Sequence, residues 1–138
     1  MLRRKVTDRL LSWKNNSHKA LLVTGARQIG KSYAIRAFGK DNYASYFEVN
    51  LLLDAEARDV LVGAKNSFDF INRVALLADA PLVEGDTLIF VDEIQEYPQI
   101  VTLMKALVED GRFSYVFSGS MLGTEFKGVS SFPVGYVE

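Results

Sequence analysis

The sequence predicts an α/β domain in which helices cover both faces of a mostly parallel sheet. Short apolar runs alternate along the chain with longer stretches of helical periodicity, an order typical of strand–helix–strand units. The run Leu88–Val91 is apolar throughout, as expected of a strand that is buried on both faces. The length of 138 residues, with 49% hydrophobic and 24% charged residues, fits one globular domain.

The first half of the chain begins with an amphipathic helix. Apolar residues recur at helical spacing from Leu2 to Trp13, and Asn15–Ser17 ends the pattern. A glycine turn directly after the apolar run 20–24 favours a buried strand there. The next expected elements are a helix over 31–38 that Gly39 stops and a strand over 43–50.

The second half continues the alternation. Pro98 suits the first turn of a helix, because its missing N–H costs nothing there, and Gly111 suits the helix end. The expected elements are helices over 53–62, 67–78 and 98–111, and strands over 86–92, 113–117 and 133–137. The sequence therefore predicts an N-terminal helix over 1–16 and one core domain over 20–137.

Composition excludes several classes of function. The formal charge of −1 provides no general attraction to nucleic acid or to an anionic membrane. The absence of cysteine excludes disulfides, thiolate zinc sites and cysteine nucleophiles. No apolar run approaches the roughly 20 residues of a membrane span, and Asp8 and Arg9 interrupt what would be a signal peptide. We expect a cytoplasmic protein without a membrane partner.

A phosphate-binding loop is the strongest motif in the chain. Gly25–Ser32 fits the pattern G-x-x-x-x-G-K-[ST] between an expected strand and an expected helix. Its backbone N–H groups and the helix dipole would surround phosphate, Lys31 would reach the β and γ phosphates as a catalytic residue, and the Ser32 hydroxyl would bind Mg²⁺. The predicted nucleotide-binding residues are Gly25, Ala26, Arg27, Gln28, Ile29, Gly30, Lys31, Ser32 and Tyr33. The alternative is a glycine-containing surface turn.

Two adjacent acids follow the strongest predicted strand. Asp92 would hold the Mg²⁺ shell, and Glu93 would orient or deprotonate the attacking water. Ligands of open α/β sheets bind at the carboxyl ends of strands, which is where these acids lie. The alternative is a pair of solvated charges at the end of a strand.

Three further polar positions are weaker candidates. Ser118 ends the next strand and would sense the γ-phosphate or steer the water, with a plain Ser-Gly turn as the alternative. Gln95 follows the acids and faces either the nucleotide or solvent. His18 and the basic residues Arg3–Lys5 are expected to be exposed, with a nucleic-acid contact as the minor alternative for the basic residues.

Four segments together resemble a known family. They are Gly-Ala-Arg-Gln-Ile-Gly-Lys-Ser from Gly25, Val-Asp-Glu-Ile-Gln from Val91, Ser-Gly-Ser from Ser118 and Ser-Phe-Pro-Val-Gly from Ser131. In order, they look like the prokaryotic predicted ATPases of the AAA type, in which an N-terminal AAA domain precedes a C-terminal domain of unknown function. The resemblance implies a three-layer P-loop fold with five strands, ATP and Mg²⁺ as ligands, ATP hydrolysis, and Ser118 in the sensor region.

The chain departs from the family pattern in two respects. Tyr136 stands where the family often has a basic residue, and residues 119–138 contain no arginine that could complete a neighbouring subunit's site. The chain also stops directly after the last predicted strand, which suggests a truncated AAA domain. The resemblance implies self-association through that domain, and nucleic-acid or protein partners through the missing C-terminal domain.

The motifs bear on four functions. A Mg-ATP hydrolase that drives an attached domain is favoured by Glu93, whereas the lack of an arginine after Arg112 favours a switch that binds ATP and turns it over slowly. A GTPase is unsupported because the chain has no Asn-Lys-x-Asp segment. A small-molecule kinase shares the phosphate-binding loop, although it does not usually need a glutamate directly after the strand's aspartate.

Overall fold

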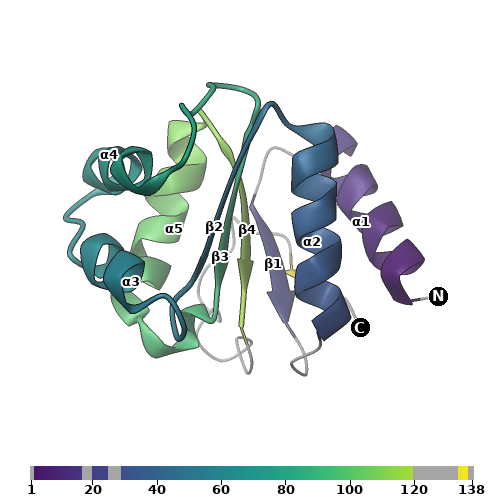
Figure 1. The fold of residues 1–138 in the computed structure, drawn as a ribbon, viewed down its shortest axis with the longest axis horizontal. Coiled ribbons are helices and arrows are strands. Elements are labelled where there is room, and N and C mark those ends of the chain that lie inside the picture. The colour runs from purple at the N-terminus through teal and green to yellow at the C-terminus, as the bar shows by residue number, and fades with distance from the viewer. Residues whose placement is uncertain (1, 17–19, 25–28, 120–133, 137–138) are drawn as a thin grey trace.

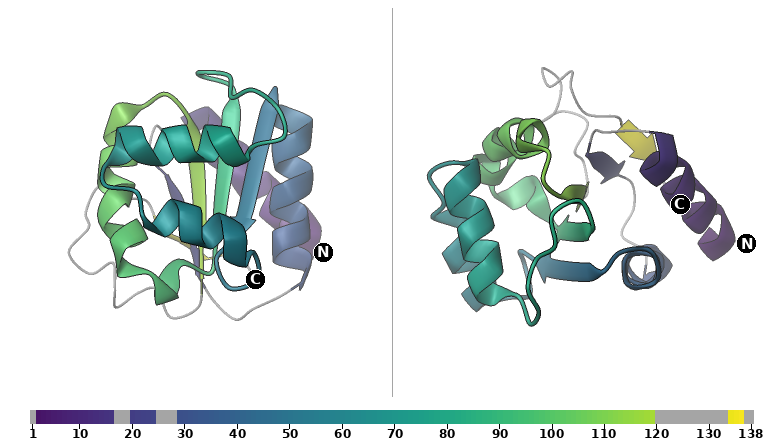
Figure 2. Two further views of the ribbon diagram at one scale, coloured as in Figure 1. Left: turned by 60° about the vertical axis from the view of Figure 1, so that its left-hand side comes forward. Right: turned by 90° about the horizontal axis from the view of Figure 1, so that it is seen from above.

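The structure is a computed structural model and describes residues 2–16, 20–24, 29–119 and 134–136. A parallel sheet lies between two layers of helices, with α1 and α2 on one face and α3, α4 and α5 on the other (Figures 1 and 2). This arrangement confirms the α/β class, and every predicted helix and strand is present. The elements in chain order are α1 Leu2–Asn16, β1 Leu21–Thr24, α2 Ile29–Asn42, β2 Ser45–Asn50, α3 Ala55–Val62, α4 Ser67–Leu77, β3 Thr87–Asp92, the 3₁₀ helix η1 Ile94–Glu96, α5 Pro98–Asp110, β4 Ser114–Ser118 and β5 Val134–Tyr136.

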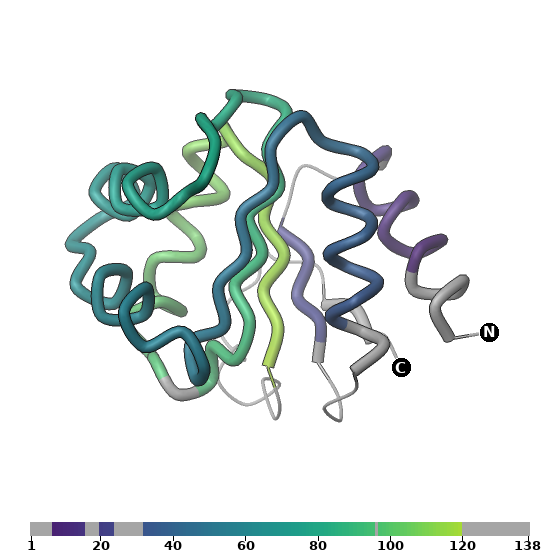
Figure 3. Tube along the Cα trace, in the orientation of Figure 1, coloured from purple at the N-terminus to yellow at the C-terminus, as the bar shows by residue number. Residues whose placement is uncertain are grey.

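The strands follow the order β2-β3-β4-β1-β5, and each described pairing is parallel. Strand β4 therefore lies between β1 and β3, although it comes after both in the sequence. The Cα trace in Figure 3 shows β2, β3 and β4 running alongside one another between α5 and α2. The three-residue strand β5 extends the sheet beyond β1.

Alternation along β3 divides the core into two halves. Leu88 and Phe90 pack toward α1 and α2, whereas Ile89 and Val91 pack toward the opposite helices, and none of the four is exposed. Because successive side chains of a strand point to opposite faces, the next residue, Asp92, faces α2. This alternation positions the site described below.

Gly39 does not stop α2, so the prediction of a helix end at this residue was wrong. The helix continues to Asn42, whose Nδ2 donates to the carbonyl of Phe38 at 3.0 Å. A Cβ on Gly39 would collide with the ring of Tyr46 and lie 3.0 Å from Leu88. The glycine therefore serves close packing of the helix on the sheet instead of a turn.

Two other helix ends have the expected chemistry. Asn66 caps α4 by accepting a hydrogen bond from the N–H of Asp69 at 2.8 Å. Pro98 lies in the first turn of α5, and Gly111 ends that helix in the left-handed conformation at φ 75°. Among the helices in the described ranges, none is both long and apolar enough to cross a membrane.

Candidate nucleotide site

The candidate site lies at the edge of the sheet where the parallel strands end. The register places Asn50 beside Asp92 and Val23 beside Ser118, so the carboxyl ends of four strands share this edge. Helix α2 begins at the same edge, directly after residues 25–28 in the sequence (Figure 1). Open α/β sheets bind their ligands at this edge.

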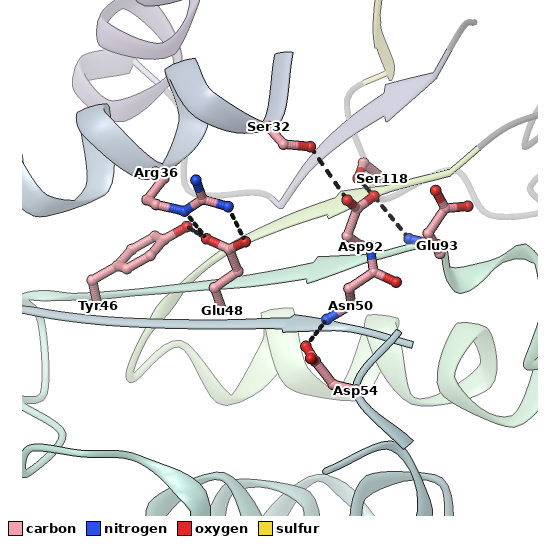
Figure 4. Close-up of polar contacts among 9 residues, drawn as sticks. All are labelled: Ser32, Arg36, Tyr46, Glu48, Asn50, Asp54, Asp92, Glu93 and Ser118. Carbon is pink, nitrogen blue, oxygen red and sulfur yellow. Dashed lines mark hydrogen bonds and ion pairs between the residues drawn. The ribbon is translucent and has the colours of Figure 1, made fainter. Parts of the chain in front are cut away.

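Asp92 is at the centre of the polar contacts in the site. The Ser32 hydroxyl donates to its Oδ2 at 3.4 Å, although the two residues are 60 positions apart in the sequence. The Ser118 hydroxyl and the backbone N–H of Glu93, the latter at 2.9 Å, donate to its Oδ1 (Figure 4). The structure thus brings together Ser32 and Asp92, which the sequence analysis assigned to one metal ion.

The chemistry of these donors fits Mg²⁺. The ion prefers hard oxygen ligands, keeps several waters, and usually takes one or two protein groups together with phosphate oxygens. Ser32 and Asp92 provide such oxygens. In the described part of the chain, no group of three or more His, Cys, Asp or Glu residues is placed to hold a metal ion.

The phosphate-binding segment is described only in part. Residues 25–28, which carry four of the predicted ligands, lie outside the described residues. Ile29–Lys31 form the first turn of α2, and Ser32 follows with its hydroxyl toward Asp92. Tyr33 is 49% exposed. The phosphate-binding roles of these residues, including that of Lys31, remain predictions.

Glu93 has an unusual backbone. Its φ of 62° and ψ of 46° lie in the left-handed region, and in the described residues it is the only non-glycine with positive φ. Such a conformation is uncommon for a residue with a side chain and costs free energy. The residue is 6% exposed, and its Oε1 accepts a hydrogen bond from Gln95 Nε2 at 2.8 Å. Because of this turn, the Glu93 carboxylate faces Gln95, whereas the Asp92 carboxylate faces Ser32 and Ser118.

Ser118 and Gln95 both lie within this group of residues. Ser118, which is 1% exposed, ends β4 on the same face of the sheet as Val116 and donates to Asp92. Its contact is therefore with the carboxylate, and its sensing of the γ-phosphate remains a prediction. Gln95 faces Glu93, so its side chain is directed into the site.

Sequence reasoning missed an ion pair beside the site. Arg36 lies one helical turn after Ser32, and its Nε and Nη2 donate to the Glu48 carboxylate at 2.8 and 2.7 Å. The Tyr46 hydroxyl donates to the same carboxylate at 2.7 Å (Figure 4). The available signal was an acid within a predicted strand and a base at i+4 from the predicted metal ligand.

The protonation of this ion pair follows from its contacts. Burial by itself would raise the pKa of Glu48, but hydrogen bonds from Arg36 and Tyr46 outweigh it and hold the pKa below its ordinary value. The bond to Glu48 raises the pKa of Arg36. Burial, followed by the bond to Glu48, raises the pKa of Tyr46, which therefore keeps its proton and acts as a donor. Arg36 and Glu48 form the ion pair and Tyr46 adds a neutral hydrogen bond, so the group of three has no net charge.

A separate cavity of about 370 Å³ opens at the opposite edge of the sheet. Trp13, Tyr43, Arg112 and Tyr115 are among its lining residues. None of the residues that contact Asp92 lines it. Its position excludes it as the binding site of a nucleotide held by Ser32 and Asp92.

Comparisons with known proteins agree with this geometry. The sequence matches the model of a family described as AAA domain, AAA_14, over residues 17–138. The structure of Drosophila ORC bound to GC-rich DNA and Cdc6 is similar with a TM-score of 0.58 and 10% identity, covering 98% of this chain and 57% of that chain. The structure of C. elegans PCH-2 is similar with a TM-score of 0.53 and 18% identity, covering 99% and 38%. The search of curated proteins found no match.

Each comparison supports a different statement. The two structural likenesses show the fold alone, because the identities are low, and the chain spans less than two-thirds of either neighbour. The family match covers nearly the whole chain and includes Ser32, Asp92 and Ser118. With this match and the geometry of the sheet edge, the chain belongs to the AAA_14 family of AAA domains and is a nucleotide-binding AAA module.

Proposed function

We propose that the chain binds Mg-ATP through residues 25–33 and hydrolyses it to ADP and phosphate. The observation that carries the proposal is the contact at 3.4 Å between Ser32 Oγ and Asp92 Oδ2. It joins the start of the helix after the phosphate-binding loop to the end of the central strand. A surface turn and a pair of solvated end charges, the two alternatives, provide no reason for this contact.

Each site residue has a separate role in this proposal. The backbone of the loop and Lys31 bind the phosphates, and Ser32 and Asp92 hold Mg²⁺, which neutralises phosphate charge when it is bound. Glu93 takes the proton of the attacking water or orients it. Its separate direction from Asp92 supports this division, because a base must face the water and not the metal.

The wider setting is also a proposal. The family resemblance supports a cytoplasmic module of a prokaryotic protein, whose nucleotide cycle drives a further domain that contacts nucleic acid or protein. It also supports self-association of the AAA domain, which would place a neighbour's residues at the nucleotide.

A switch that binds ATP and hydrolyses it very slowly is the second candidate. It is favoured by the absence of arginine from residues 119–138, because an arginine at the γ-phosphate contributes roughly 10³ to 10⁵ in rate. Single-turnover hydrolysis by the purified chain separates the two functions. A rate of about 1 s⁻¹ indicates an enzyme that needs no group from another chain or domain.

Binding itself is tested by thermal unfolding with millimolar Mg-ATP. Ligand at about 100 times its dissociation constant stabilises by roughly 2.7 kcal/mol, a rise in midpoint on the order of 5–15 °C for a domain of this size. Lys31→Ala should remove the rise while the variant stays folded, because the ammonium contacts phosphate. Lys105→Ala, at an exposed position of α5, is the matched control and should keep it. An unchanged midpoint with a folded wild-type chain contradicts the proposal.

A further inference from the structure

We infer that Gln95 is the positioning residue of Glu93, and that Gly119 exists to leave room for the Gln95 side chain. The inference deepens the proposed function and rests on it, because Glu93 acts on water only if the chain hydrolyses ATP. Gln95 lies on η1, directly after the left-handed turn at Glu93, and donates from Nε2 to Glu93 Oε1 at 2.8 Å. Glu93 is 6% exposed, and the contact is partly buried.

The Glu93 carboxylate determines the orientation of the Gln95 amide. A carboxylate accepts and cannot donate, so only the NH₂ group of the amide can face it. The amide oxygen then points the other way, and in the described part of the chain this Oε1 is buried without a hydrogen-bond partner. A buried carbonyl without a partner costs free energy, so the bond to Glu93 keeps the amide in a place it would otherwise avoid.

Gly119 explains why the amide fits there. A Cβ on this residue would collide with Gln95 Oε1 and lie 3.3 Å from the backbone N of Ile94. Its backbone does not need a glycine, since Gly85 and Gly111 are the described glycines with positive φ. The backbone N–H of Gly119 donates to the carbonyl of Val23 at 3.3 Å, which fixes its place beside β1. The lack of a side chain therefore serves the space taken by Gln95.

These contacts link Glu93 to the end of β4. Ser118 ends β4 and donates to Asp92, and Gly119 follows it directly, so two consecutive residues locate both acids, one by direct contact and one through Gln95. A general base that is already oriented lowers the activation barrier, because no conformational entropy is lost in orienting it during the reaction. In this inference Gln95 acts through Glu93, to which it donates its hydrogen bond.

The first experiment needs no nucleotide. The side-chain amide resonances of Gln95 in the wild-type chain, assigned by their loss in Gln95→Ala, should shift in Glu93→Ala and again in Gly119→Ala. Gln99→Ala, at an exposed glutamine of α5, should leave them in place. Resonances that stay unchanged in Glu93→Ala overturn the inference, whether or not the chain hydrolyses ATP.

The second experiment measures single-turnover hydrolysis and Mg-ATP affinity. Gln95→Ala and Gly119→Ala should each lower the rate by about 10- to 100-fold, the order expected for a misplaced catalytic group, with the dissociation constant unchanged. The double variant should be no slower than Gln95→Ala, because Gly119 acts only through Gln95. Additive losses, unchanged turnover or an equal loss of affinity overturn the inference. If the wild-type chain binds no Mg-ATP, the proposed function is wrong. The amide resonances then still show whether Gln95 contacts Glu93.

Discussion

Asp92 and Glu93 are neighbours in the sequence but have different surroundings. Asp92 continues the strand and faces α2, where hydroxyl and backbone donors surround its carboxylate. Glu93 leaves the strand through a left-handed turn, which directs its carboxylate to Gln95. Two carboxylates that are adjacent in the sequence thus receive different contacts from one change in backbone direction.

At this scale, we predict that Glu93→Gln binds Mg-ATP as tightly as the wild type and loses hydrolysis. An amide keeps the size of the carboxylate but cannot take a proton, and general-base catalysis contributes about 10²- to 10⁴-fold. Single-turnover rates and the thermal shift with Mg-ATP measure the two properties. Glu109→Gln, at an exposed position of α5, is the control. Full turnover by Glu93→Gln would move the catalytic role to another residue.

At the scale of elements, α2 is the part on which the site depends. It carries Ser32 near its start. Farther along, it contacts β2 at two places, through the ion pair of Arg36 with Glu48 and through the close packing of Gly39 on Tyr46. Both fastenings involve residues of the edge strand β2. The position of Ser32 relative to Asp92 is therefore set by packing away from the nucleotide.

Gly39→Ala should destabilise the domain although it replaces glycine within a helix. Helix propensity alone favours alanine by about 1 kcal/mol. The new methyl group would collide with the Tyr46 ring, and overpacking costs typically about 1–3 kcal/mol. The ring cannot move easily because its hydroxyl is bonded to Glu48. We expect urea unfolding to show a net loss in the free energy of unfolding. The control Asp41→Ala, at an exposed position of the same helix, should change this free energy by about zero.

Glu48→Gln should lower the free energy of unfolding at neutral pH by about 1.5–3 kcal/mol, the range for hydrogen bonds to charged groups. The folded pKa of Glu48 lies below its ordinary value of 4.5, so the ion pair stabilises fully above that value. The stabilisation is lost as the pH falls through the lower, folded pKa. Urea unfolding of both proteins from pH 7 to pH 3 should show the difference shrink with acidity. A constant difference would mean that the carboxylate charge is irrelevant.

At the scale of the whole molecule, the fold gathers four strand ends and the start of α2 at one edge and leaves that edge to the ligand. Arg36, one helical turn after Ser32, is paired with Glu48. An arginine for the γ-phosphate, in addition to the charge of Lys31, would therefore have to come from elsewhere in the chain or from a neighbouring copy.

Turnover should then depend on protein concentration. If a neighbouring copy supplies the charge, hydrolysis per chain should rise on the order of tenfold or more as the chains associate, within the 10³ to 10⁵ that such a group contributes. Steady-state rates and sedimentation velocity over the same concentrations measure both quantities. A rate per chain that stays constant while the chains associate contradicts a shared site.

The sequence by itself determined the elements and predicted the residues of the candidate site. Apolar runs and periodicity located the strands and helices, because burial of one face imposes a period that is readable in the chain. The phosphate-binding pattern and the acids after β3 were readable because their chemistry needs fixed residue types at short spacing. Gly39 misled the prediction, since a glycine that ends a helix and one that packs against a ring look the same in a sequence.

Only the tertiary structure decided which residues meet. Strand order cannot be read from local patterns, and it is the placement of β4 between β1 and β3 that brings Ser118 to Asp92. The Arg36–Glu48 pair and the fit of Gln95 against Gly119 likewise join different elements. Such contacts depend on packing between different elements, which is a property of the folded chain that local sequence patterns do not specify.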